Sequence, residues 1–103
     1  MNLISGDGHG LVFMNIFTVR PENQEALVAC IREGAPASVP GLLSAKLLKS
    51  RNRTRVINYM IWESRQAFDQ ATAGNSAIAA TRERVQQLIE EAALDAYDVI
   101  DVK

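Results

Sequence analysis

Two strand-like segments that are apolar on both faces constrain this fold more than any other feature of the sequence. Residues 11–19 read LVFMNIFTV and residues 55–63 read RVINYMIWE, and both are rich in β-branched and aromatic residues. Because side chains alternate between the faces of a strand, each segment places large apolar groups on both sides of a sheet. Helices on one face leave the other in water. Such a face marks an interaction surface, and a second copy of the chain is its simplest cover.

The other segments complete a βαββαβ order. They are expected, in chain order, as a helix from 21 to about 35, a turn at 40–41, a strand over 42–50, a hairpin loop over 51–54, a helix over 64–72, a helix over about 76–92 and a strand over 96–102. This order predicts an α+β fold of the ferredoxin-like kind, an antiparallel four-stranded sheet with helices on one face. Two such sheets placed face to face would form a dimeric α+β barrel.

Length and composition allow one ordinary globular domain. The chain has 103 residues, so we expect a flexible tail over 1–10 and a single domain over 11–103. Eleven Lys and Arg against twelve Asp and Glu give a net charge of -1, which favours neither a nucleic-acid partner nor a membrane surface. The sequence shows no secretory signal and no apolar stretch of roughly 18 to 20 residues. We therefore expect a cytoplasmic protein without nucleic-acid or membrane partners.

Cysteine and histidine are too scarce for a thiolate or histidine metal site. Cys30 is the only cysteine, and it is interpreted as a small buried apolar side chain. His9 is the only histidine, so a histidine-rich site is excluded. The sequence also carries no flavin, haem or nucleotide motif. We expect no cofactor and no metal.

Three hydrogen-bond donors are expected to share one cavity. Asn58 and Trp62 lie four residues apart on the strand over 55–63, so they point to the same face, about 13 Å apart. Arg82 falls on the apolar stripe of the last helix, with Val85 and Ile89. If the strand face looks toward the helices, an amide, an indole N–H and a guanidinium converge. Such donors stabilise an oxygen that becomes negative during a reaction.

Each of these residues also has an ordinary structural interpretation. Trp62 could be core packing, Arg82 could extend to solvent, and Asn58 could bond to neighbouring backbone groups. Asn15, in the middle of the strand over 11–19, poses the same question as Asn58. Asn is depleted in strands, and a buried amide without a partner costs about 1 to 3 kcal/mol. The functional interpretation therefore depends on the shared orientation of these residues.

Three segments carry a resemblance to a known family. They read MNIFTVRPENQEAL over 14–27, PGLLSAKLLKS over 40–50 and VINYMIWESRQAF over 56–68. The most specific part is a strand followed by W-E-S-x-x-A-F, which begins at Trp62. Over about residues 12–102 the chain resembles the antibiotic biosynthesis monooxygenase family. That resemblance implies a dimeric α+β barrel.

Within the family, the chain is most similar to the cofactor-independent oxygenases of aromatic polyketide pathways, which convert anthrones to quinones with O2. The resemblance implies that Asn58, Trp62 and Arg82 are catalytic, and that the partners are a small aromatic substrate, O2 and a second copy of the chain. Phe68 stands where that subgroup has a pocket tyrosine, so a possible proton carrier is missing. The residues expected to bind the substrate are Asn15, Phe17, Met60, Phe68 and Ile78.

The expected function is a cofactor-independent monooxygenase that oxidises an anthrone, phenol or quinol to a quinone, and two alternatives stay open. The first is a dimeric barrel that binds a small ligand without turning it over, because a fold alone does not decide function. The second is haem degradation, since the haem-degrading members have a similar Trp and a first-strand Asn, matched by Asn15. The position of their axial His is Arg82 here, which disfavours haem ligation.

Overall fold

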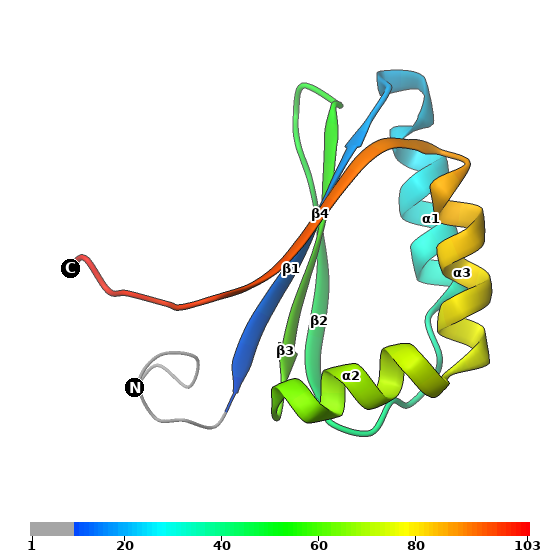
Figure 1. Ribbon diagram of the computed structural model, residues 1–103. Helices are drawn as coiled ribbons and strands as arrows, with labels where there is room; N and C mark the ends of the chain where they lie inside the picture. Colours follow the sequence, from blue (N-terminus) through cyan, green and yellow to red (C-terminus); the bar gives the residue numbers. More distant parts are fainter. Residues whose placement is uncertain (1–9) are drawn as a thin grey trace.

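The protein has two layers, a sheet and helices that all lie on one of its faces, as the computed structural model in Figure 1 shows. The structure describes residues 10–103, so the predicted tail over 1–10 lies outside the described residues except for Gly10. The elements are β1 (Leu11–Val19), a 3-10 turn η1 (Pro21–Asn23), α1 (Gln24–Gly34), β2 (Leu42–Lys49), β3 (Arg55–Trp62), α2 (Arg65–Gly74), α3 (Ser76–Gln86) and β4 (Ile89–Tyr97). In this range, no helix has the length and apolar character needed to span a membrane.

The sheet confirms the ferredoxin-like α+β prediction. Its strands run in the order β2-β3-β1-β4, and each neighbouring pair is antiparallel. The two segments with the strongest strand signal, β1 and β3, occupy the centre. They pair so that Phe13 lies opposite Met60 and Asn15 lies opposite Asn58. The two asparagines that the sequence singled out are therefore cross-strand neighbours.

The predicted boundaries of the last helix and last strand were wrong. α3 ends at Gln86, and β4 spans Ile89–Tyr97, whereas a helix to about residue 92 and a strand over 96–102 were expected. The segment IEEAALDAY contains Glu, Ala and Leu, which favour helix. It nevertheless pairs with β1, with Ile89 opposite Val19, because tertiary context overrides a weak local preference. Ile89 therefore belongs to the sheet and not to the helical stripe.

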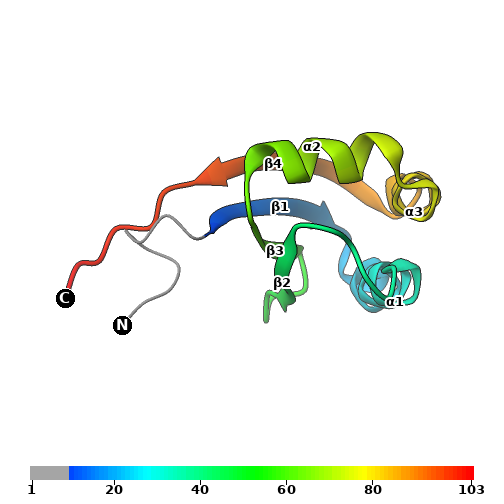
Figure 2. The same ribbon diagram turned by 90° about the horizontal axis from the view of Figure 1, so that it is seen from below.

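Two polar caps define the break between α2 and α3. Ser64 Oγ accepts a hydrogen bond from the Ala67 backbone N–H at 3.1 Å, as expected of an N-cap. Asn75 Oδ1 accepts from the backbone N–H groups of Ala77 at 2.9 Å and Ile78 at 3.1 Å, so a new helix begins there. The chain turns at this point. Figures 1 and 2 show α2 crossing one end of the sheet, while α3 runs beside α1.

The core is divided into two apolar clusters with a polar gap between them. One cluster contains Phe17, Val19, Leu27, Val56 and Val85. The other contains Phe13, Met60, Trp62 and Phe68. On the helix-facing side of the central strands, Asn15 and Asn58 lie between these clusters. The gap marks the place where the protein departs from a continuous core.

The sheet face away from the helices is also apolar, as the sequence predicted. Five apolar residues of this face are partly exposed in the single chain, namely Met14, Ile16, Ile57, Tyr59 and Ile61, whereas Val12 on the same face is buried. The last residues beyond β4 leave the sheet and extend away from the rest of the chain (Figures 1 and 2). Ile100 and Val102 in this segment are 80% and 93% exposed. Both features leave apolar surface available to a partner.

Candidate active site

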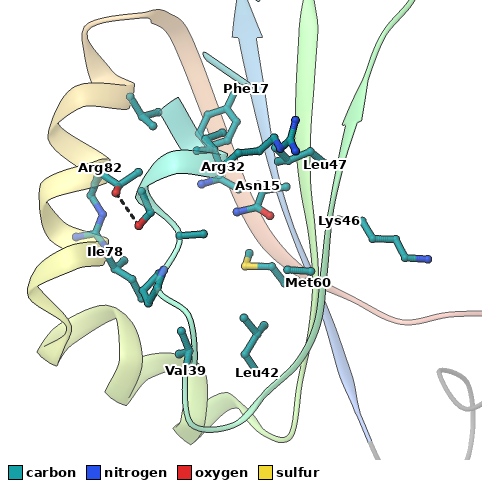
Figure 3. Close-up of a pocket in the computed structure, with 18 of the residues that line it drawn as sticks. Asn15, Phe17, Arg32, Val39, Leu42, Lys46, Leu47, Met60, Ile78 and Arg82 are labelled. Carbon is teal, nitrogen blue, oxygen red and sulfur yellow. Dashed lines mark hydrogen bonds between the residues drawn. The ribbon is translucent and has the colours of Figure 1, made fainter. Parts of the chain in front are cut away.

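A cavity of about 810 Å³ lies between the sheet and the helices (Figure 3). The central strands β1 and β3 and the edge strand β2 supply one wall, and α1, α3 and the segment between α1 and β2 supply the other. All of the candidate residues named from the sequence line this cavity, namely Asn15, Phe17, Asn58, Met60, Trp62, Phe68, Ile78 and Arg82. The structure therefore brings together residues from four separate elements.

The asparagine pair lies in the middle of the sheet wall. Asn15 and Asn58 face each other across β1 and β3, where opposite side chains have Cβ atoms about 5 Å apart. Within residues 10–103, Asn15 Oδ1 is buried and has no hydrogen-bond partner. An amide oxygen left in this state costs about 1 to 3 kcal/mol unless a ligand supplies a donor. Asn15 Oδ1 is therefore an unsatisfied acceptor in an otherwise apolar part of the wall.

Trp62 supplies the complementary polar atom. Its side chain is 2% exposed, and its indole Nε1 is buried without an acceptor among the described residues. Phe68 of α2 holds the indole edge-on, with ring centroids 5.5 Å apart and an interplanar angle of 85°. Phe68 also stacks on Phe13 at 4.3 Å. These aromatic contacts fix the indole, so its N–H is held ready to donate to an oxygen.

Arg82 borders the same cavity at its edge. The residue lines the cavity from α3, but it is exposed to solvent. In Figure 3 its side chain lies along α3 next to Ile78. The guanidinium therefore keeps contact with water, and its charge is screened more than that of a buried group. Trp62 and Asn15 form the deep polar part of the site, and Arg82 forms part of its rim.

A close contact between α1 and α3 fixes the wall formed by the helices. Thr81 Oγ1 donates a hydrogen bond to the Gly34 carbonyl at 3.2 Å. A Cβ built on Gly34 would lie 2.0 Å from Thr81 Oγ1, so only glycine allows the helices to approach this closely. Thr81 precedes Arg82, and the contact therefore sets the position of the rim.

The α1 residues that line the cavity were not predicted from the sequence. Glu25 and Arg32 of α1 and Lys49 of β2 line the cavity there. Lys49 Nζ donates to Glu25 Oε2 at 2.6 Å, and this hydrogen bond, with the lysine charge, holds the pKa of Glu25 below its ordinary 4.5. The Glu25 carboxylate is thus charged at neutral pH. The sequence feature that could have pointed to Arg32 is its position in the last turn of a helix whose other face is apolar.

The described residues offer no set of metal ligands. In residues 10–103 no group of three or more His, Cys, Asp and Glu side chains is placed to hold a metal ion. Cys30 is half-buried and unpaired in this part of the chain. His9, the histidine noted in the sequence, lies outside the described residues. The polar groups that line the cavity include amides, an indole, hydroxyls and guanidinium groups, besides the paired Glu25 and Lys49.

Solved structures with the same fold span nearly the whole chain. A Streptomyces coelicolor monooxygenase from the gene ActVA-Orf6, solved with nanaomycin D, is 27% identical at a TM-score of 0.82, with 99% of this chain and 97% of that chain covered. SnoaB, a cofactor-independent oxygenase from Streptomyces nogalater, is 20% identical at a TM-score of 0.70, with 91% and 96% covered. An antibiotic biosynthesis monooxygenase candidate from Nitrosomonas europaea is 20% identical at a TM-score of 0.79, with 92% and 94% covered.

A match to the sequence model of a protein family shows which family the chain belongs to. No curated protein matches the chain. The family model for antibiotic biosynthesis monooxygenases matches residues 11–84, which include β1 to β3, α2, most of α3 and all of the candidate residues. The chain therefore belongs to the antibiotic biosynthesis monooxygenase family.

Proposed function

We propose that this protein is a cofactor-independent monooxygenase that oxidises an anthrone, phenol or quinol to a quinone with O2. The observation that carries the proposal is the pair of buried, unpartnered polar atoms in an aromatic-lined cavity. Trp62 Nε1 can donate to a substrate oxygen, and Asn15 Oδ1 can accept from a substrate hydroxyl. A volume of about 810 Å³ falls in the usual range for a small-molecule site.

The proposed chemistry uses electrons from the substrate itself. An anthrone loses a proton from its CH2 carbon to water at the rim and becomes an enolate, whose negative oxygen accepts from Trp62 Nε1, while the Asn58 amide donates to a further oxygen of a hydroxylated anthrone. The carbanion passes one electron to O2, and the two radicals combine into a peroxide anion, which takes a proton back from water to become a hydroperoxide. Loss of water then gives the ketone carbon. The balance is one anthrone and one O2 converted to one quinone and one water.

The chain's own residues bind, orient and shield the substrate in this scheme. Phe68, Phe17 and Met60 supply apolar contacts to an aromatic ring, and Ile78 contributes from α3. Phe68 carries no hydroxyl, so it positions the ring and does not carry a proton. Excluding water from this part of the cavity protects the radical and hydroperoxide stages from side reactions.

We also propose that the working form is a homodimer. The apolar face formed by Met14, Ile16, Ile57, Tyr59 and Ile61 is only partly covered within one chain. Each square ångström of apolar surface left in water costs about 25 cal/mol, so a second sheet placed on this face would stabilise both copies. Two such sheets face to face give the expected dimeric α+β barrel.

Oxygen consumption by chelator-treated protein tests the function. With 1,8-dihydroxyanthrone as the substrate, we expect one O2 to disappear for each quinone formed, faster than in buffer alone. Absorbance would follow the quinone, and an oxygen electrode would follow O2. A rate equal to that of buffer, together with measurable binding of the anthrone, would refute catalysis and favour the ligand-binding alternative.

A further inference from the structure

The charged residues that line the cavity are mostly basic. They are Glu25, Arg32, Lys46, Lys49 and Arg82. The whole chain has a net charge of -1, so this excess is local. Lys49 is paired with Glu25 at 2.6 Å, and Figure 3 shows Lys46 pointing away from the cavity. Among residues 10–103, the guanidinium groups of Arg32 and Arg82 remain as uncompensated charges.

Neither guanidinium is held by a carboxylate of the described chain. The ion pairs within residues 10–103 join Arg20 to Glu90, Lys49 to Glu25 and Arg65 to Asp69. Arg65 shows the usual arrangement, because Asp69 lies four positions later on the same helix. The neighbours three and four positions away from Arg32 and Arg82 are Val28, Ala29, Ala35, Pro36, Ile78, Ala79, Val85 and Gln86, none of them acidic.

These two arginines border an apolar interior. Arg32 extends from α1 toward Leu47 of β2, and Arg82 lies along α3, with Met60 and Phe17 farther inside (Figure 3). Both arginines are exposed, whereas Phe17 is 6% exposed. A ligand that suits this arrangement has an aromatic body and an anionic end. A guanidinium binds a carboxylate through two parallel N–H···O bonds, which an amide or ester group does not match.

We propose that Arg32 and Arg82 form an anion-selective rim, and that the substrate is an aromatic acid whose carboxylate stays at this rim while its ring enters the cavity. The aromatic part of this inference rests on the proposed function. The anion preference rests only on the positions and the unpaired charges of the two arginines. Arg32 and Arg82 therefore determine which substrates bind.

A matched ligand pair tests the preference without any turnover. The probes are 6-hydroxy-2-naphthoate and 6-hydroxy-2-naphthamide, which share a ring system and differ in charge. Isothermal titration calorimetry gives the Kd of each at neutral pH. We expect the carboxylate to bind about tenfold more tightly at low salt, and we expect much of that difference to disappear at about 0.5 M NaCl because exposed charges are screened.

Charge-removing variants assign the preference to the rim. Arg32→Gln and Arg82→Gln should each reduce the carboxylate preference about threefold and leave the Kd of the amide unchanged. Arg51→Gln is the matched control, because Arg51 is exposed in the β2–β3 turn and does not line the cavity. It removes the same charge and should keep the full preference.

The outcomes separate this inference from the proposed function. Equal affinities for the two wild-type ligands would overturn the anion site, and so would an equal loss of preference in Arg51→Gln. An intact preference that depends on Arg32 and Arg82, in a protein that consumes no O2, would support the anion site and refute the oxygenase. A protein that consumes O2 but shows no preference for the carboxylate would support the oxygenase and refute the anion site.

Discussion

Replacing Trp62 by phenylalanine separates a catalytic donor from a packing residue. The substitution keeps an aromatic ring against Phe68 and removes the indole N–H, which has no acceptor within residues 10–103. If Trp62 were only a core residue, the main effect would be on stability. If its N–H stabilises a developing oxyanion, the main effect would be on the rate.

The expected change in folding free energy is small because two terms oppose each other. Trp62 is 2% exposed, and losing two buried ring carbons costs roughly 1.6 kcal/mol at about 0.8 kcal/mol for each buried carbon group. Removing a buried donor without a partner returns about 1 to 3 kcal/mol. We therefore expect the free energy of unfolding to change by no more than about 1 kcal/mol.

The expected change in rate is larger. Removing one donor from a preorganised oxyanion site lowers kcat about 100-fold or more in known enzymes. Trp62 Nε1 is the donor assigned to the enolate oxygen here, so we expect Trp62→Phe to lower anthrone oxidation about 100-fold. Oxygen uptake measures the rate, and urea unfolding measures the stability of the same sample.

Val56→Ala provides the opposite control. Val56 is 0% exposed, belongs to the other apolar cluster and does not line the cavity. Its truncation should cost about 2 kcal/mol of stability and leave the rate per folded molecule unchanged. A Trp62→Phe protein that unfolds earlier but oxidises the anthrone within about twofold of wild type would refute the assigned role.

Two further predictions concern the helix contact and the free sheet face. Gly34→Ala places a Cβ 2.0 Å from Thr81 Oγ1, so urea unfolding should show a loss of about 1 to 3 kcal/mol, and calorimetry should show weaker ligand binding. Gly74→Ala, whose Cβ meets nothing within 4 Å, should instead stabilise the protein by about 0.5 to 1 kcal/mol. Ile57→Glu should convert a dimer into monomers in sedimentation velocity, whereas Gln86→Glu on the exposed face of α3 should not. A wild-type protein that is monomeric at micromolar concentration would contradict the dimer.

The central strands could be predicted from sequence because their signal is strong and local. β-branched and aromatic residues with alternating faces identified β1 and β3, and Ser64 identified the start of α2. β4 was predicted too late in the chain, since its sequence is helix-favouring and only pairing with β1 makes it a strand. The local helix and strand preferences of residues do not take pairing with a distant strand into account.

The site could be predicted only in part for a similar reason. Strand alternation placed Asn58 and Trp62 on one face, and the helical period placed Arg82 on the stripe that looks toward it. The direct pairing of Asn15 with Asn58 depends on the register between β1 and β3, which the sequence does not specify by itself. Arg32 was missed because its place at the cavity follows from the packing of α1 on α3.

The two asparagines explain why the core is divided into two clusters. Two apolar clusters could merge into one core if Asn15 and Asn58 were replaced by valine and leucine, since the positions on both sides are already apolar. Such a core would bury more apolar surface and leave no amide oxygen unpaired, so it would be the more stable choice. The chain instead keeps polar groups in the middle of its best strands. Stability is given up there at the positions where a substrate oxygen or hydroxyl would complete the missing hydrogen bonds, as expected of a binding site.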